Sequence, residues 1–439
     1  MMWIPITVLA LVAQTILAHS SYVVQLSNNT SFEDYLKNSI AQTLNIKPSD
    51  DNKIEIGDFK AFITSFDDKL VDQLKNHDLV SNVFPNITLG TQGVKLDDIE
   101  PVRRYRKVLQ KEPEHVSTFS KRDGVTTQQN APRHLARLSS REGIFNKKSP
   151  FEYKYDYTGK GITAYVLDSG VAILNPDFQG RAKHGGNFAF LGINGDFYGH
   201  GTNVAGIIGS KTYGVAKEVD IIDVKIAGLL DGGSTESVLK GIEWANNDRK
   251  QKGVKAVANL SLGTEKTQVL DEAVNAAYKD GLVMVVAAGN ANIDAKDVSP
   301  ASAQDAITVG ALDDKTDTIA IFSNYGPDVD IFASGVAVES LCNILFFPPT
   351  QWYGTSQATP VVSGLVAILL EKGVAKEDIK SELIKLATKN AISQETFDHN
   401  SNYTQTVNRV VNNGVISLND KVSNPSTLEQ DQSLKKFIG

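Results

Sequence analysis

Short apolar runs recur through the central part of the chain, and helical repeats separate several of them. The helical repeats lie at 237–246 and 268–280, where apolar residues return every three or four positions. Strands that are apolar throughout and alternate with helices are typical of a parallel sheet covered on both faces. We therefore expect an α/β domain with a doubly wound, mostly parallel sheet. The expected strands are 162–167, 219–225, 256–260, 282–287 and 306–309.

The segment from 21 to 89 has a different pattern. Strand-like runs at 22–26 and 59–66 are each followed by an amphipathic helical stretch, and a further strand falls within 80–87. This order indicates a small, separate α+β unit.

An apolar run at 3–13 precedes this unit. Polar residues follow it, with Ala18 and Ser20 placed as in a secretory signal peptide. The run is short for a spanning helix, although a membrane-anchored start is the alternative. No later stretch is long and apolar enough to cross a bilayer, so we expect delivery through the secretory pathway to the vacuole, the cell wall or the medium.

Between the two units, residues 90–124 carry basic clusters and little apolar periodicity. Such a segment is a solvated linker, and an exposed linker is also where a protease would cut. The expected divisions are a signal peptide at 1–20, a small domain at 21–90, a basic linker with a processing site at 91–125, the α/β domain at 126–414 and a polar tail at 415–439.

Composition narrows the function classes. The 439 residues carry a formal net charge of −7, with 41% hydrophobic and 22% charged residues, which fits a folded protein and does not favour nucleic-acid binding. The single cysteine, Cys342, excludes an internal disulfide framework and a multi-cysteine zinc site.

Three polar motifs stand where an open α/β sheet places reactive groups, at strand ends and helix starts. Asp168 ends a buried strand, His200 stands between two glycines, and Ser356 begins an apolar helix. Each alone is more often a turn former, a structural histidine or a helix cap. The chain order Asp, His, Ser is that of subtilisin, and the three contexts together favour a catalytic set.

Further motifs make this comparison specific. Residues from about 129 to 370 resemble a subtilisin-family serine protease of the proteinase K and fungal vacuolar branch, and 21–89 resembles the family's ferredoxin-like inhibitory propeptide. The motifs are Gln-Asn-Ala-Pro at 129–132, Val-Ala-Ala-Gly-Asn at 286–290, Ser-Pro-Ala-Ser at 299–302 and Ser-Asn-Tyr-Gly at 323–326.

The resemblance implies roles for individual residues. Ser356 would be the nucleophile, His200 its general base and Asp168 the group that orients His200. Asn290 would stabilise the oxyanion together with the Ser356 backbone N–H. Two backbone edges would bind an extended peptide substrate by strand addition. They comprise Ser261, Leu262 and Gly263 on one side and Gly232 and Gly233 on the other.

Several positions depart from the family pattern. Asn203 and Val361 replace histidines, and Gln357 replaces a methionine directly after the nucleophile. None removes a catalytic group, but Gln357 can tilt the start of the helix, and small misplacements are costly in rate. The competing hypothesis is therefore a catalytically impaired binding or regulatory protein that keeps its propeptide.

The remaining expectations concern partners and modification. We expect a monomer acting on polypeptides, with its own propeptide as intramolecular inhibitor, no nucleic-acid or membrane partner and no required cofactor. Asp313 stands where proteinase K relatives use a carboxylate to bind a structural calcium ion. A single aspartate is equally consistent with a turn-capping role. Glycosylation sequons begin at Asn28, Asn29, Asn86, Asn259 and Asn402, of which Asn259 lies in an expected buried strand.

Overall fold

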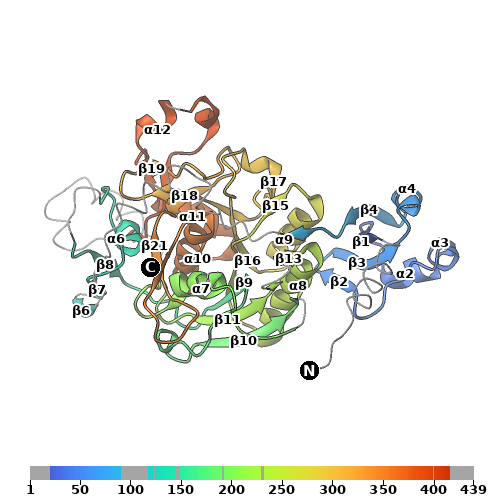
Figure 1. Cartoon of the computed structure of the whole chain (residues 1–439), viewed down its shortest axis with the longest axis horizontal. Coiled ribbons are helices and arrows are strands. Elements are labelled where there is room, and N and C mark those ends of the chain that lie inside the picture. The colour runs from blue at the N-terminus through green and yellow to red at the C-terminus, as the bar shows by residue number, and fades with distance from the viewer. Residues whose placement is uncertain are drawn as a thin grey trace, which may run out of the picture.

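The computed structural model describes residues 20–89, 117–122, 124–144, 149–189, 192–228, 232–398 and 400–415. A small N-terminal unit lies beside a larger α/β unit (Figure 1). The expected signal peptide, most of the expected linker and nearly all of the polar tail lie outside the described residues.

A ten-stranded sheet runs through the larger unit, in the order β10-β11-β9-β14-β16-β18-β20-β24-β23, with β19 paired to β18. Neighbouring strands from β10 to β24 are parallel, and only β19 and β23 pair antiparallel to their neighbours. The expected doubly wound, mostly parallel sheet is confirmed. Its strands are β9 (Thr163–Asp168), β10 (Ala182–Asn187), β11 (Asp220–Lys225), β14 (Ala256–Leu260), β16 (Val283–Ala287), β18 (Ile307–Asp313), β19 (Thr318–Ile319), β20 (Ile331–Ser334), β23 (Thr388–Lys389) and β24 (Arg409–Val410).

Helices cover both faces of this sheet, which explains why its strands are apolar throughout. Side chains alternate along a strand. In β9, Ala164 and Val166 enter the core under α7 (His200–Gly209) and α10 (Thr355–Glu371), whereas Tyr165 and Leu167 enter the core under α8 (Thr235–Lys252) and α9 (Gln268–Lys279). The remaining helices of the unit are α6 (Arg133–Leu138), α11 (Ile379–Leu386) and α12 (Gln394–Asp398), with 3-10 turns at Pro176–Phe178, Ala295–Asp297, Lys376–Asp378 and Ser401–Gln405.

The N-terminal unit is a four-stranded antiparallel sheet in the order β2-β3-β1-β4. Val24 of β1 packs against the unit's own helices, whereas its neighbour Val23 joins the core of the larger unit beneath α8 and α9. One hydrophobic cluster therefore spans both units, beside a second cluster that lies within the N-terminal unit. The elements are β1 (Ser20–Leu26), α2 (Phe32–Lys37), α3 (Ser39–Thr43), β2 (Lys53–Ile56), β3 (Phe59–Phe66), a 3-10 turn (Asp68–Leu70), α4 (Val71–Lys75) and β4 (Val80–Pro85).

Four short sheets complete the architecture. One of them, β6-β7-β8, begins inside the segment expected to be linker. Its first strand, β6, pairs antiparallel with β7. Residues 118–122 of the expected linker are thus paired with a strand of the larger unit. The short strands are β5 (Thr88–Leu89), β6 (Thr118–Arg122), β7 (Val125–Gln129), β8 (Glu152–Tyr155), β12 (Ala227–Gly228), β13 (Gly232–Ser234), β15 (Thr264–Glu265), β17 (Val298–Ser299), β21 (Val338–Ser340) and β22 (Thr350–Trp352).

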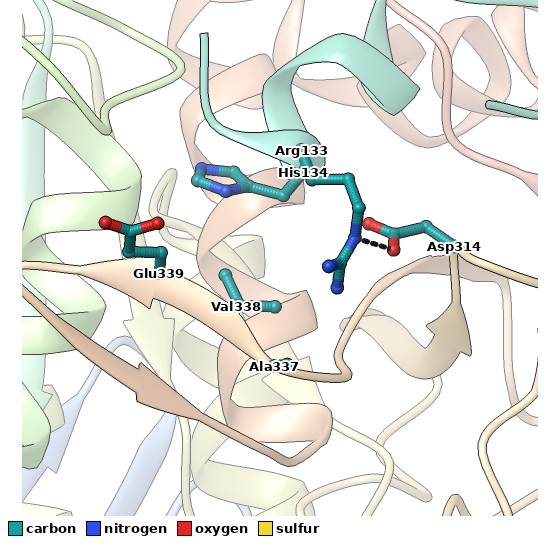
Figure 2. Close-up of a pocket in the computed structure, with 6 residues that line it drawn as sticks. All are labelled: Arg133, His134, Asp314, Ala337, Val338 and Glu339. Carbon is teal, nitrogen blue, oxygen red and sulfur yellow. Dashed lines mark hydrogen bonds and ion pairs between the residues drawn. The ribbon is translucent and has the colours of Figure 1, made fainter. Parts of the chain in front are cut away.

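Two buried arginines anchor α6 to the turn after β18. Arg133 forms an ion pair with Asp314 and donates to the Val336 carbonyl at 2.7 Å, and Figure 2 shows its side chain running alongside the Asp314 carboxylate. Arg137 pairs with Asp317 at 2.9 Å one turn later.

The described helices include none that is long and apolar enough to cross a membrane.

Candidate active site

The sheet brings the expected catalytic residues to one edge. Asp168 is the last residue of β9, and Ser261 and Asn290 follow β14 and β16, so all three lie at the carboxyl ends of neighbouring parallel strands. His200 is the first residue of α7 and Ser356 the second residue of α10. The two helices pack against each other beneath this edge. Ligands of open α/β sheets bind at this kind of edge.

Asp168 and His200 form a buried, hydrogen-bonded pair. His200 Nδ1 lies 2.7 Å from Asp168 Oδ1, and the Ser169 backbone N–H donates to the same oxygen at 2.7 Å. A carboxylate only accepts, so Nδ1 carries the proton and Nε2 is the ring nitrogen left for a substrate or nucleophile. Burial lowers the pKa of His200, but the charge and hydrogen bond of Asp168 and the charge of Asp196 outweigh it and raise the pKa above its ordinary value.

The first turn of α7 approaches β9 so closely that one position must be glycine. A Cβ on Gly201 would lie 2.1 Å from the Gly170 carbonyl oxygen and 3.1 Å from the Asp168 Cβ. Any side chain there would push α7 away from Asp168 and break the pair. Glycine, which has no Cβ, permits this close approach of the two backbones beside His200.

Ser356 is held by reciprocal hydrogen bonds with Ser261. The Ser356 hydroxyl donates to the Ser261 carbonyl at 3.0 Å, and the Ser261 hydroxyl donates to the Ser356 carbonyl at 2.9 Å. Asn259 fixes Ser261 in turn, since its Nδ2 donates to the Ser261 hydroxyl at 2.9 Å. The Ser356 proton therefore points at a carbonyl in this structure rather than at His200, and catalytic hydrogen bonds often tighten only once substrate is bound.

Asn290 is oriented by the residue before Ser356. Its Oδ1 accepts from the Thr355 backbone N–H at 2.8 Å and from the Thr355 hydroxyl at 2.9 Å. With Oδ1 committed to Thr355, Nδ2 is the end that can donate elsewhere. It lies 3.4 Å from where a Cβ on Gly354 would stand, and thus beside the start of α10. The Ser356 N–H is among the first-turn donors that have no carbonyl partner within their own helix.

Sequence reasoning missed two neighbours of His200. Asp196 is buried and accepts five hydrogen bonds, from Ser169, Tyr198, Gly199 and both the N–H and hydroxyl of Thr202. It therefore holds the turn before α7 and adds negative charge near His200. The Trp352 ring meets the His200 ring edge-on at 5.6 Å. Asp196 precedes His200 by four residues and was detectable as a local acidic signal, whereas nothing local predicts the contact with Trp352.

Strand β5 pairs with part of the expected substrate edge at 232–233. Strand β5 pairs antiparallel with β13, with Leu89 opposite Gly233 and Thr88 opposite Ser234. The Leu89 side chain is buried in the core that also contains Leu262. Ser261, Leu262 and Gly263 are buried and follow β14 at the same end of the sheet.

The departures from the family pattern are accommodated within the interior. Gln357 Nε2 donates to Asn203 Oδ1 at 3.5 Å, and Asn203 Nδ2 donates to the Thr350 carbonyl at 3.4 Å. Val361 is buried in the core between α10 and the sheet. The Gln357 Oε1 atom is buried without a hydrogen-bond partner among the described residues.

Cation binding has a limited basis in the described residues. Asp313 Oδ1 accepts from the Lys315 backbone N–H at 3.0 Å, as in a capped turn, and no cluster of three or more acidic, histidine or cysteine side chains occurs in the part of the chain described. The Asp330 carboxylate and the Ala306 carbonyl contact the Lys380 ammonium, at 2.9 Å and 2.8 Å. A calcium ion at Asp313 stays a prediction.

The sequons differ in accessibility. Asn28, Asn29 and Asn402 are exposed, whereas Asn259 is fully buried in β14. Asn86 lies between the units, where its Oδ1 accepts from the Glu236 N–H at 3.0 Å in the first turn of α8.

Comparisons with known proteins identify the family of this chain. The profile of the Subtilase family matches residues 159–410. The chain is 37% identical over 417 residues to the subtilase-type proteinase RRT12 of Saccharomyces cerevisiae, covering 91% of this chain and 83% of that protein. It is 37% identical over 351 residues to alkaline protease 1 of Aspergillus clavatus, covering 78% of this chain and 77% of that protein.

A solved structure is similar to about two thirds of this chain. The crystal structure of a cold adapted subtilisin-like serine proteinase is similar with a TM-score of 0.58 and 32% sequence identity, covering 66% of this chain and 100% of that one. This chain therefore belongs to the subtilase family.

Proposed function

We propose that this protein is a serine endopeptidase of the secretory pathway that hydrolyses peptide bonds in proteins through an acyl-enzyme intermediate. The observation that carries the proposal is the buried 2.7 Å contact between Asp168 and His200, at the sheet edge where α10 presents Ser356. A structural histidine does not need a buried carboxylate on one nitrogen and a serine-bearing helix start beside it.

The roles follow from the hydrogen-bonding capacity of each group. Ser356 Oγ attacks the scissile carbonyl carbon while His200 Nε2 takes the hydroxyl proton, and Asp168 stabilises the imidazolium without taking that proton. Negative charge develops on the former carbonyl oxygen, where Asn290 Nδ2 and the Ser356 N–H would donate. When the C–N bond breaks, His200 returns the proton to the leaving amine. Water then attacks the carbonyl carbon of the acyl-enzyme while His200 takes its proton. The bond to Ser356 Oγ breaks, His200 returns the proton to that oxygen, and the acid is released.

We propose further that the protein is made as a zymogen. Residues 21–89 would inhibit the enzyme, since β5 pairs with Gly233 and Ser234 of β13, the edge that an extended substrate would use. Cleavage within the basic segment 90–124 would break the covalent link between the two units. The apolar run at 3–13 supports the secretory route, with the vacuole, the cell wall and the medium as destinations.

Intact mass of the purified protein, wild type beside Ser356→Ala, tests self-maturation. We expect the wild type to lose its N-terminal unit and Ser356→Ala to keep it. Identical full-length masses would favour the impaired binding protein with a retained propeptide. Identical cleavage of both would show that another protease processes the chain, and would contradict self-maturation.

A further inference from the structure

An apolar surface lies beside His200 that the proposed catalytic steps do not use. The loop between β21 and β22 carries four consecutive exposed apolar residues, with Phe346 91% and Phe347 63% exposed. Two neighbouring segments expose Phe197 and Leu174. We call these residues the apolar rim; they are Leu174, Phe197, Ile344, Leu345, Phe346 and Phe347.

Hydrogen bonds hold the three segments of the apolar rim together. Asn343 Nδ2 donates to the Asp196 carbonyl at 2.9 Å, next to Phe197. Asn175 Nδ2 donates to the Cys342 carbonyl at 3.4 Å, next to Leu174. The rim is thus built from the described segments around 174, 197 and 344–347. Exposed apolar side chains gathered on neighbouring segments are typical of an interaction site.

Both ends of the β21–β22 loop touch the turn that carries His200. On the outgoing side, a Cβ on Gly199 would lie 3.1 Å from Asn343 Oδ1. On the returning side, the Trp352 ring lies 5.6 Å from the His200 ring and 5.9 Å from the Tyr198 ring. The apolar rim is therefore continuous with the His200 side of the site.

Chemistry assigns this side to one half of the substrate. His200 gives its proton to the leaving amine, so the first residue after the cleaved bond lies beside His200 as the bond breaks. The other half of the substrate would lie on the β13 edge, where β5 now pairs. The part of a polypeptide that meets the apolar rim is the part C-terminal to the cleaved bond.

We propose that the apolar rim binds apolar side chains on the C-terminal side of the scissile bond and makes the enzyme selective for polypeptides that carry them. This inference rests on the proposed endopeptidase function. Burial of exposed aromatic side chains is a strong source of binding energy at such surfaces, and the two phenylalanines are the most exposed members of the loop.

The test compares three substrates with identical residues before the cleaved bond. Two are internally quenched peptides whose four residues after that bond are either Leu and Phe or Gly and Ser. The third is a p-nitroanilide, which has no residue after the cleaved bond. We expect wild-type kcat/KM to be about tenfold higher for the apolar peptide than for the polar one, because the apolar side chains of the substrate leave water when they pack on the rim. The p-nitroanilide reports catalysis without the apolar rim.

The variant Phe346→Ser/Phe347→Ser should bring the ratio between the two peptides close to one, with the loss confined to the apolar peptide. Ile321→Ser is the matched control, since Ile321 is 54% exposed and lies outside the apolar rim; it should keep the preference. If the double variant also hydrolysed the p-nitroanilide more slowly, its substitutions would have disturbed catalysis itself. The peptide preference would then be measured in Phe346→Ser alone, because that side chain is almost fully exposed and its loss should not disturb the fold. An undiminished preference in both variants would overturn the proposal.

Two other outcomes have distinct meanings. A wild type that cleaves none of the three substrates would overturn the proposed function, and the proposal with it. The Ser356→Ala protein can also be sedimented with phosphatidylcholine–phosphatidylserine vesicles. If it binds them through Phe346 and Phe347, and the wild type shows no preference between the two peptides, the apolar rim binds a lipid surface and the peptide proposal is overturned.

Discussion

Gln357 Nε2 donates to Asn203 Oδ1 at 3.5 Å and so links α10, which carries Ser356, to α7, which carries His200. Both side chains are fully buried. The two departures from the family pattern are thus partners of each other, and the hydrogen bond spans the two helices whose spacing positions the catalytic set.

This relationship predicts coupled effects on stability. Asn203→Leu alone should lower the free energy of unfolding by about 1–3 kcal/mol, because the Gln357 amide is left buried without its partner. Asn203→Leu combined with Gln357→Met should recover much of that loss. Chemical denaturation in a Ser356→Ala background, which prevents self-digestion, measures the cycle. Additive effects would contradict the pairing.

The oxyanion role of Asn290 predicts a kinetic signature. Asn290→Ala should lower kcat by about 10²–10³-fold with little change in KM, as loss of one such donor does in subtilisin, a member of the same family. Because Asn290 Oδ1 also holds Thr355, the unfolding midpoint should be measured beside the kinetics. A main effect on KM would assign Asn290 to substrate binding instead.

The charges around His200 set the pH dependence. Since Asp168 and Asp196 stabilise the imidazolium and raise the pKa of His200 against the opposing effect of burial, activity should be lost as pH falls through an apparent pKa above about 6.5. Asp196→Asn removes one negative charge, which lowers this pKa and moves the acidic limb of kcat/KM to lower pH. The exposed Asp220→Asn is the control. A shift to higher pH in Asp196→Asn would contradict the electrostatic account.

The Arg133–Asp314 pair predicts a large effect on stability far from the catalytic residues. Asp314 is 1% exposed, so Arg133→Met leaves a buried carboxylate without its cation and should lower the free energy of unfolding by about 3–5 kcal/mol. Adding Asp314→Leu should restore most of it. Lys296→Met, which removes an exposed ion pair with Asp294, should cost about 1 kcal/mol or less. Equal effects of Arg133→Met and Lys296→Met would show that burial does not matter here.

Glycan placement tests the docked arrangement of the two units. Asn402 is exposed and should carry a glycan, whereas Asn259 is buried and should not. Asn86 should stay unmodified in protein that retains its N-terminal unit, because its side chain bonds to the first turn of α8. Glycopeptide mass spectrometry measures all three sites. A fully occupied Asn86 would contradict the docked arrangement.

The sequence predicted the parts of the fold that depend on local patterns. Continuous apolar strands such as 162–167 are buried on both faces, so their composition alone indicates a parallel sheet. Strand β2 was missed because its four residues are too few to establish an alternating pattern, and β6 was missed because all five of its residues are exposed. In β6 the pairing with β7 provides the structure, and its own side chains give no signal.

The candidate site divides in the same way. Asp168, His200 and Ser356 stand in local motifs at strand ends and helix starts, so the sequence predicted them and the fold brings their segments together at one edge. Trp352 and the pairing of Asn203 with Gln357 depend on contacts between segments about 150 residues apart in the chain. A single sequence carries no local signal for such contacts.

Labelling with a fluorophosphonate tests the central claim, that Ser356 is an activated nucleophile, most directly. Mature wild type, Ser356→Ala and Asp168→Asn would be treated together and the modified peptide identified by mass spectrometry. We expect one adduct on Ser356 in wild type, none in Ser356→Ala and much slower labelling in Asp168→Asn, where the hydrogen bond that orients His200 is altered. A mature wild type that does not react, or that reacts equally fast after Asp168→Asn, would contradict the account.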